Sequence, residues 1–280
     1  MSAAAAAPAP DPVVEFAGVT KTFAAGTPRA FTAIRDVSFR LEDHPGRGEL
    51  VSILGPSGSG KSTILRLIAG LPPHHPCSQG TVRVGGWPVA GPGADRGMVF
   101  QDYTSFDHLT VEDNVAFGLA CRGVSSDEQR ARAREWIAKV GLDVDRDAAK
   151  YPHQLSGGMR QRVAIARTLI LSPRIILMDE PFGALDPTTR FAMQDLLISL
   201  WREQEASVFF VTHSIEEAVY LGDRVFLLSA SPGTLLREIP VPPPDRPAQV
   251  MQREPAFLEC VFDIRDTLDR LEGADRQGDG

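Results

Sequence analysis

Long apolar stretches are missing from this 280-residue chain. No run reaches the roughly 18 apolar residues that a helix needs to span a bilayer. We therefore expect the protein to stay in the cytosol and to serve a membrane process only by docking on another protein.

Cysteine and basic charge are also scarce. Cys77, Cys121 and Cys260 form no Cys-x-x-Cys pair, which argues against a zinc site or a disulfide framework and favours a reducing compartment. Lys and Arg total 29 against 36 Asp and Glu, a formal net charge of −7. Proteins that bind nucleic acid along a surface carry a basic surplus or stripe, so no nucleic-acid partner is expected.

Hydrophobic periodicity predicts an α/β fold. Residues 13–23 and 33–42 alternate apolar and polar side chains, as half-exposed antiparallel strands do, with Gly26 and Pro28 in the turn between them. Continuous apolar strands are expected at 49–55, 174–181 and 207–213, with shorter strands at 81–84 and 97–100, and helices are expected at 61–71, 111–141, 156–171 and 188–204. Buried strands that alternate with helices indicate a parallel sheet covered by helices.

The two ends of the chain differ in composition from its middle. Residues 1–12 are rich in Ala and Pro and are expected to form a disordered tail. Residues 236–280 are expected to form a Pro-rich linker and a short C-terminal helical extension. In the loop after the first helix, His74 and His75 are expected to be solvated.

The segment GPSGSGKST, residues 55–63, matches the pattern G-x-x-x-x-G-K-[ST] between a predicted strand and a predicted helix. This is the context of a phosphate-binding P-loop. Backbone N–H groups of such a loop cradle phosphate oxygens, the Lys reaches the β- and γ-phosphates, and the first hydroxyl after it can bind Mg²⁺. The candidate nucleotide-binding residues are Gly55, Pro56, Ser57, Gly58, Ser59, Gly60, Lys61, Ser62 and Thr63.

A pair of carboxylates, Asp179 and Glu180, ends the apolar strand at 174–181. Alone, such a pair is more often a solvated loop or a helix cap. After a P-loop, Asp179 is a candidate Mg²⁺ ligand and Glu180 a candidate general base for an attacking water.

The segment LSGGMRQR, residues 155–162, resembles the signature motif of ATP-binding cassette (ABC) transporter ATPases. The resemblance implies that Ser156, Gly157 and Gly158 meet the γ-phosphate of ATP held by a second copy, although these residues alone would suit a Gly-rich helix cap. Other positions match in order across residues 13–235. Gln101 resembles the Q-loop glutamine, Asp186 the D-loop aspartate, His213 the switch histidine, and Phe23 the aromatic that stacks on adenine.

This resemblance implies a P-loop NTPase (RecA-like) core with an antiparallel β subdomain and an inserted α-helical subdomain at about 102–170. It implies ATP and Mg²⁺ as cofactors, Gln101 as a further Mg²⁺ contact, Gln101 and His213 as catalytic residues together with Glu180, and a second nucleotide-binding subunit, in a homodimer. A separate transmembrane permease and a substrate-binding protein are expected partners, and the chain is expected at the cytoplasmic side of the inner membrane. The segments at 99–119 and 181–190 look most like importers of nitrate, sulfonate, taurine or bicarbonate.

Three alternatives stay open at this point. A P-loop kinase or GTPase would share residues 55–63 and Asp179 but would not need LSGGMRQR. A soluble ABC-type ATPase of DNA repair or ribosomes usually has two cassettes or a long insertion, and this chain shows no internal repeat. An ABC exporter or lipoprotein-extraction ATPase would share every motif.

Overall fold

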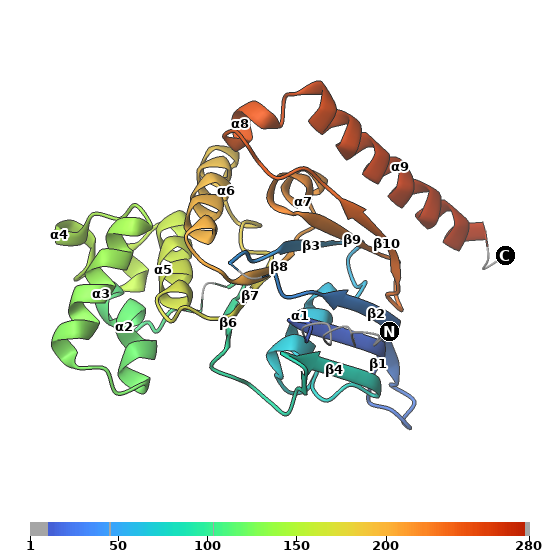
Figure 1. Cartoon of the computed structure of the whole chain (residues 1–280), viewed down its shortest axis with the longest axis horizontal. Helices are drawn as coiled ribbons and strands as arrows, with labels where there is room; N and C mark the ends of the chain where they lie inside the picture. The colour runs from blue at the N-terminus through green and yellow to red at the C-terminus, as the bar shows by residue number, and fades with distance from the viewer. Residues whose placement is uncertain (1–10, 45, 103, 278–280) are drawn as a thin grey trace, which may run out of the picture.

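The computed structural model describes residues 11–44, 46–102 and 104–277, so most of the expected N-terminal tail, residues 1–10, lies outside the described residues. Two sheets meet in the body of the molecule, and a group of helices stands to one side of them (Figure 1). No helix within these ranges is long and apolar enough to cross a membrane.

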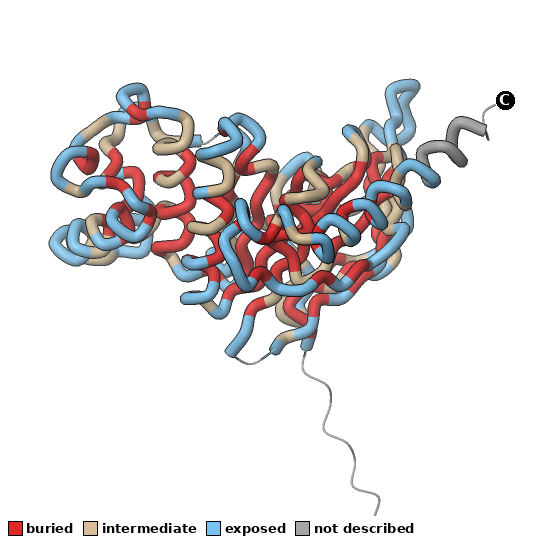
Figure 2. The backbone as a smooth tube through the Cα atoms, turned by 90° about the horizontal axis from the view of Figure 1, so that it is seen from above, coloured by how far each residue is buried: buried red, intermediate tan, exposed pale blue. Residues whose placement is uncertain are grey.

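The larger sheet has the strand order β10-β9-β3-β8-β7-β6. All neighbouring pairs are parallel except β10 with β9. Its strands are β3 (Leu50–Leu54), β6 (Arg96–Val99), β7 (Ile175–Asp179), β8 (Ser207–Val211), β9 (Arg224–Leu228) and β10 (Leu235–Pro240). Every residue of β3, β7 and β8 is buried, because helices cover one face of this part of the sheet and a helix together with a second, smaller sheet covers the other. Figure 2 shows buried backbone in the middle of the molecule. The prediction of a parallel sheet is confirmed.

The smaller sheet is antiparallel and contains the hairpin expected at the start of the chain. Its order is β2-β1-β4-β5. The strands are β1 (Val14–Phe23), β2 (Phe31–Leu41), β4 (Gln79–Val84) and β5 (Trp87–Pro88). Helix α1 (Lys61–Ala69) packs with both sheets in one apolar cluster, in which Phe39 contacts Phe16 of β1 and Phe209 of β8.

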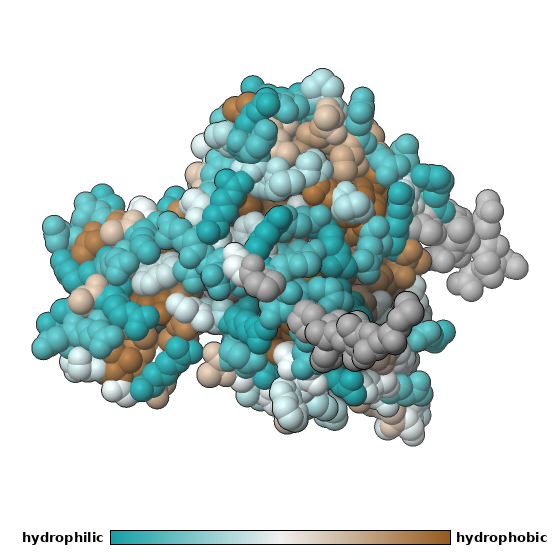
Figure 3. Space-filling view, in the orientation of Figure 1, coloured by the Kyte–Doolittle hydropathy of each residue, from teal (hydrophilic) through white to brown (hydrophobic). Residues whose placement is uncertain are grey.

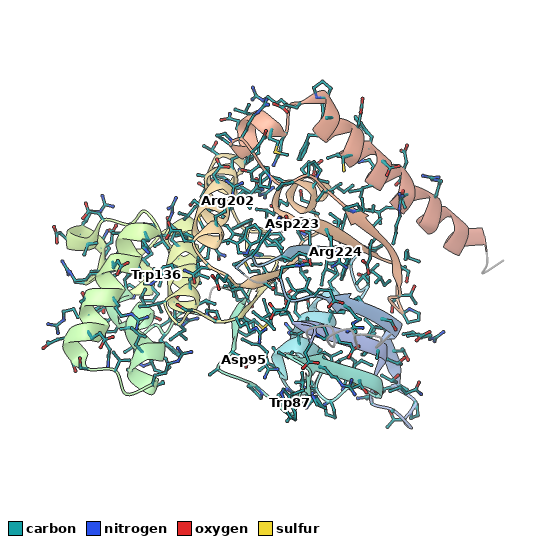
Figure 4. All side chains as sticks on the ribbon, in the orientation of Figure 1. Trp87, Asp95, Trp136, Arg202, Asp223 and Arg224 are labelled. Atoms are coloured by element: carbon teal, nitrogen blue, oxygen red, sulfur yellow. The ribbon has the colours of Figure 1, made fainter. Side chains whose placement is uncertain are left out.

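The chain segment that connects β6 to β7 forms a separate group of helices. It contains α2 (Val111–Cys121), α3 (Ser126–Lys139), α4 (Val144–Asp147), the 3₁₀ turn η1 (Pro152–Gln154) and α5 (Gly157–Leu169). Thr110 and Ser125 cap the first two helices by accepting backbone N–H groups, which fixes where these helices begin. Trp136 lies among the helices of the group and is buried (Figure 4).

The C-terminal segment after residue 235 departs in part from the expectation. Residues 236–240, expected to begin a linker, belong to β10, which pairs antiparallel with β9, so this part of the prediction is wrong. Only pairing with β9 distinguishes this short segment from a loop. Helices α6 (Pro187–Arg202) and α7 (Ile215–Leu221) follow β7 and β8, and α8 (Ala248–Met251) precedes α9 (Pro255–Gln277). At 23 residues α9 is longer than the short helix expected, and it buries Phe257, Val261 and Ile264.

Candidate nucleotide site

The segment 55–63 forms a loop between β3 and α1, as predicted. Gly60 has a φ of 83°, a left-handed backbone that favours glycine, and a Cβ there would lie 2.4 Å from Ile34 Cγ2 and 2.8 Å from the carbonyl oxygen of Ala33. Gly55 also has no room, because a Cβ would lie 2.9 Å from the carbonyl oxygen of Leu228. Close backbone packing therefore requires Gly55 and Gly60, whereas Gly58 has open space around it and only its φ of 81° favours glycine.

The ammonium group of Lys61 is held inside this loop. Its Nζ donates hydrogen bonds to the carbonyl oxygens of Gly55 at 2.8 Å and Pro56 at 2.9 Å. Lys61 is only 6% exposed, and this burial lowers its pKa, while Glu180 and Asp179 act in the opposite direction. The positive charge of Lys61 is therefore placed inside the loop, where the oxygens of a triphosphate could take over the hydrogen bonds that the carbonyl oxygens of Gly55 and Pro56 now accept.

Two predicted metal ligands lie in contact although 117 positions separate them. Ser62 Oγ donates a hydrogen bond of 2.7 Å to Asp179 Oδ1, and Arg66 lies 3.6 Å from Asp179 Oδ2. Burial raises the pKa of Asp179, and the Ser62 hydrogen bond lowers it. One hydroxyl and one carboxylate are the oxygen ligands that Mg²⁺ prefers. Within the described residues no group of three or more His, Cys, Asp or Glu could hold a metal, so Mg²⁺ would need phosphate oxygens and water to complete its shell.

Glu180 and His213 meet where β7 and β8 end. The parallel register pairs Asp179 with Val211, so the residues that follow these strands emerge at one edge of the sheet. His213 Nδ1 lies 3.3 Å from Glu180 Oε2, and the His213 side chain is 64% exposed. Glu180 has a φ of 46°, which costs a non-glycine residue about 1 kcal/mol or more. The strained backbone at Glu180 holds its carboxylate beside the P-loop residues that line the same cavity, an arrangement that suits the positioning of a water.

The predicted signature and D-loop residues lie at the starts of α5 and α6, away from the cavity beside the P-loop. Ser156 caps α5, accepting the N–H of Met159 at 3.3 Å, and Gly157 and Gly158 form the first turn of this helix. Asp186 caps α6 in the same way, and its hydrogen bonds with Thr189 lower its pKa. None of these residues lines the cavity beside the P-loop. A single chain therefore brings together only part of the predicted site.

Gln101 is also separate from the P-loop. It is exposed and lines a different cavity with Pro152, Arg160 and Ala184. Its predicted roles toward Mg²⁺ and in catalysis would need this segment to approach Ser62 and Asp179.

Three rings line the cavity beside the P-loop, and sequence reasoning identified only one of them. Phe23 was predicted, whereas Phe31 and His74 were missed, and the expectation of a solvated His74 is wrong. The ring of His74 packs edge-on against Phe23, with 5.1 Å between ring centroids. Phe31 pairs with Phe23 across the β1–β2 hairpin, so the strand register could have revealed it, but no sequence signal points to His74.

Comparison with known proteins identifies the family of the chain. A family model described as ABC transporter matches residues 34–183. The nitrate import ATP-binding protein NrtD of Synechocystis sp. is 46% identical over 84% of this chain and 88% of its own. The taurine import ATP-binding protein TauB of Rhizobium johnstonii is 46% identical over 89% of this chain and 94% of its own.

A solved structure extends the comparison to the fold. A dimeric ATP-binding cassette in a post-hydrolysis state, bound to ADP and Pi, superimposes with a TM-score of 0.70 at 35% identity, covering 82% of this chain and 99% of its own. The core is accordingly that of a P-loop NTPase, with an antiparallel sheet added at one side and helices inserted at the other. From the family model, the relatives and the architecture together, we conclude that this chain belongs to the ABC transporter family.

Proposed function

We propose that this chain is the ATP-hydrolysing subunit of an importer that moves a small anion, such as nitrate, sulfonate, taurine or bicarbonate, through a separate permease. The observation that supports it most is the convergence of Lys61, the Ser62–Asp179 pair and the Glu180–His213 pair at one edge of the parallel sheet. The import subunits for nitrate and taurine at 46% identity support the direction of transport and the substrate class.

Each residue has a proposed task in hydrolysis. Lys61 gives up its carbonyl partners and donates to phosphate oxygens, and Glu180 takes a proton from the attacking water. His213, in contact with Glu180, orients that carboxylate toward the water. Mg²⁺, when held by Ser62, Asp179 and Gln101, neutralises charge on the phosphates. Burial of Asp179 destabilises its charged form and raises its pKa, and a cation beside it would stabilise the carboxylate.

A second copy of the chain completes the site in this proposal. Ser156, Gly157 and Gly158 offer a helix N-terminus and bare backbone, a combination that suits an anion. Asp186, at the start of α6, belongs to the same contact surface. ATP binding would close two copies around two nucleotides, and hydrolysis would reopen them. The dimeric cassette to which the fold is similar supports this arrangement.

Ser156→Arg tests the second copy. We expect ATP turnover to fall by at least about a hundredfold, since an oxyanion contact of this kind is worth that much in other enzymes, while the monomer binds ATP as before. Phosphate release and ATP titration measure the two effects. Thr110→Arg, at the N-cap of another helix, is the matched control and should keep wild-type turnover. Wild-type turnover in Ser156→Arg would mean that Ser156 is only a helix cap.

We propose that the chain consists of one nucleotide-binding domain and a C-terminal extension. Residues 13–235 form the nucleotide-binding domain, residues of about 102–170 form its helical subdomain, and residues 236–280 form the C-terminal extension, whose first segment joins the sheet as β10. We place the chain at the cytoplasmic side of the inner membrane, held there by the permease, on which a substrate-binding protein also acts.

The proposed permease surface lies where the helical subdomain meets the sheet. A cavity of about 420 Å³ opens between β6, α2 and α5. Phe106 and Phe117 line it with ring centroids 4.5 Å apart, and Phe117 is 41% exposed. Figure 3 shows hydrophobic side chains on the helical group around α2. An exposed aromatic beside an apolar hollow suits insertion of a partner segment.

Recovery of the partner tests the function. Tagged Glu180→Gln protein, isolated from membranes of its own host with ATP and Mg²⁺, should retain a multi-span membrane protein identifiable by mass spectrometry. Adding Phe117→Asp to this variant should abolish that recovery while leaving ATP binding unchanged, and Leu258→Asp, on the partly exposed face of α9, is the control. Recovery of ribosomal or DNA-bound partners would contradict the importer and favour a soluble ATPase.

A further inference from the structure

The cavity beside the P-loop is lined by two chemically different sets of residues. It has a volume of about 400 Å³. Ser57, Gly58, Lys61 and Ser62 belong to the P-loop segment, where phosphates would lie, and the rings of Phe23, Phe31 and His74 form the second set. A ligand that contacts both sets would carry negative charge in one part and an aromatic heterocycle in another.

The ring end is built by a hairpin and a loop. Phe23 and Phe31 are register partners at the turn end of the β1–β2 hairpin, so their side chains project from the same face. Phe31 is 50% exposed and lines the cavity with Phe23, so its ring is accessible to a ligand there. His74 comes from the loop after α1 and packs edge-on against Phe23, with an interplanar angle of 81°.

Hydrogen bonds to β1 hold the His74 loop in place. Lys21 Nζ donates to the carbonyl oxygen of Pro76 at 2.8 Å and lies 5.1 Å from the centre of the Phe23 ring. Ser78 N donates to the carbonyl oxygen of Thr20, and Thr22 N donates to Ser78 Oγ. Because these contacts fasten the loop to the strand that carries Phe23, the position of His74 relative to that ring is set by the fold.

The imidazole of His74 has the properties of a ligand-contacting group. Its Nδ1 is buried and makes no hydrogen bond within residues 11–44, 46–102 and 104–277. Burial lowers its pKa, and the positive charges of Arg66 and Lys21 lower it further. These effects favour the neutral ring, which packs against a heterocycle without the cost of desolvating a charge.

We propose that His74 contacts the base of the bound nucleotide, enclosing it together with Phe23 and Phe31. This inference rests on the nucleotide binding in the proposed function and adds a base-contacting residue that the chain's sequence motifs do not mark. The ligand class is a nucleoside triphosphate whose base lies among three rings and whose phosphates lie on the P-loop.

The test separates the base from the phosphates. Titration calorimetry measures the affinities of ATP and of inorganic tripolyphosphate, with Mg²⁺, for the wild-type chain and for His74→Ala, His74→Phe and His75→Ala. His75 belongs to the same loop but does not line the cavity, so its variant is the matched control. Loss of a ring against a base is expected to weaken ATP binding by about tenfold in His74→Ala. His74→Phe should restore affinity to within about twofold.

The phosphate probe decides what any loss means. Tripolyphosphate affinity should be equal in all four proteins, because the P-loop is unchanged. Unchanged ATP affinity in His74→Ala, an equal loss in His75→Ala, no recovery in His74→Phe, or a parallel loss of tripolyphosphate affinity would each overturn the role of His74. A wild-type chain that binds neither ligand would instead overturn the proposed function, and with it this inference.

Discussion

Glu180→Gln is expected to lower ATP turnover by at least about a hundredfold while ATP affinity stays within about a factor of two. General-base catalysis contributes on the order of a hundredfold or more, and the amide cannot accept the proton of the attacking water. The amide has the same shape as the carboxylate and leaves Lys61 and the Ser62–Asp179 pair intact.

The same variant should accumulate as a closed dimer. If ATP binding closes two copies and hydrolysis reopens them, a chain that binds without hydrolysing stays closed. Light scattering in ATP and Mg²⁺ should give twice the mass of the monomer, together with phosphate release close to background. Glu205→Gln, an exposed carboxylate in the turn before β8, is the control and should behave as wild type. A Glu180→Gln protein that stays monomeric with ATP would contradict the two-copy site.

Lys61→Ala is expected to act on binding itself, weakening ATP affinity by about a hundredfold. Hydrogen bonds from a charged donor are worth about 1.5–3 kcal/mol, and two decades of affinity correspond to about 2.8 kcal/mol. The substitution also removes a buried charge whose burial lowers its pKa. The nucleotide-free variant should therefore stay folded, and the loss should be seen only when nucleotide is added.

Thermal unfolding with and without ATP distinguishes a loss of ATP binding from a loss of folding in Lys61→Ala. The wild-type chain should gain stability as ATP concentration rises above the dissociation constant, and Lys61→Ala should gain much less at the same concentration. Lys139→Ala removes a lysine whose ion pairs with Glu135 and Glu203 lie at the surface, and it should keep the full ATP response. A full response in Lys61→Ala would show that the loop at 55–63 does not hold the phosphates.

Local patterns in the sequence were sufficient for much of the fold. The hairpin of β1 and β2, the buried strands β3, β7 and β8, and the helix after the P-loop were all predicted from alternation or apolar runs. These elements are determined by neighbouring residues, because side chains in a strand or helix repeat with a fixed period. β10 escaped prediction because its pairing partner β9 is what makes it a strand.

The candidate site likewise has residues that the sequence identified and contacts that only the structure revealed. The sequence by itself determined the P-loop, the carboxylates after β7 and the residue types that suit ATP and Mg²⁺, because each lies in one short segment whose order carries the signal. Only the tertiary structure decided that Ser62 meets Asp179, that Glu180 meets His213, and that His74 joins Phe23 in the cavity. Those contacts join residues from 33 to 117 positions apart and depend on strand order and loop anchoring, which no local pattern encodes.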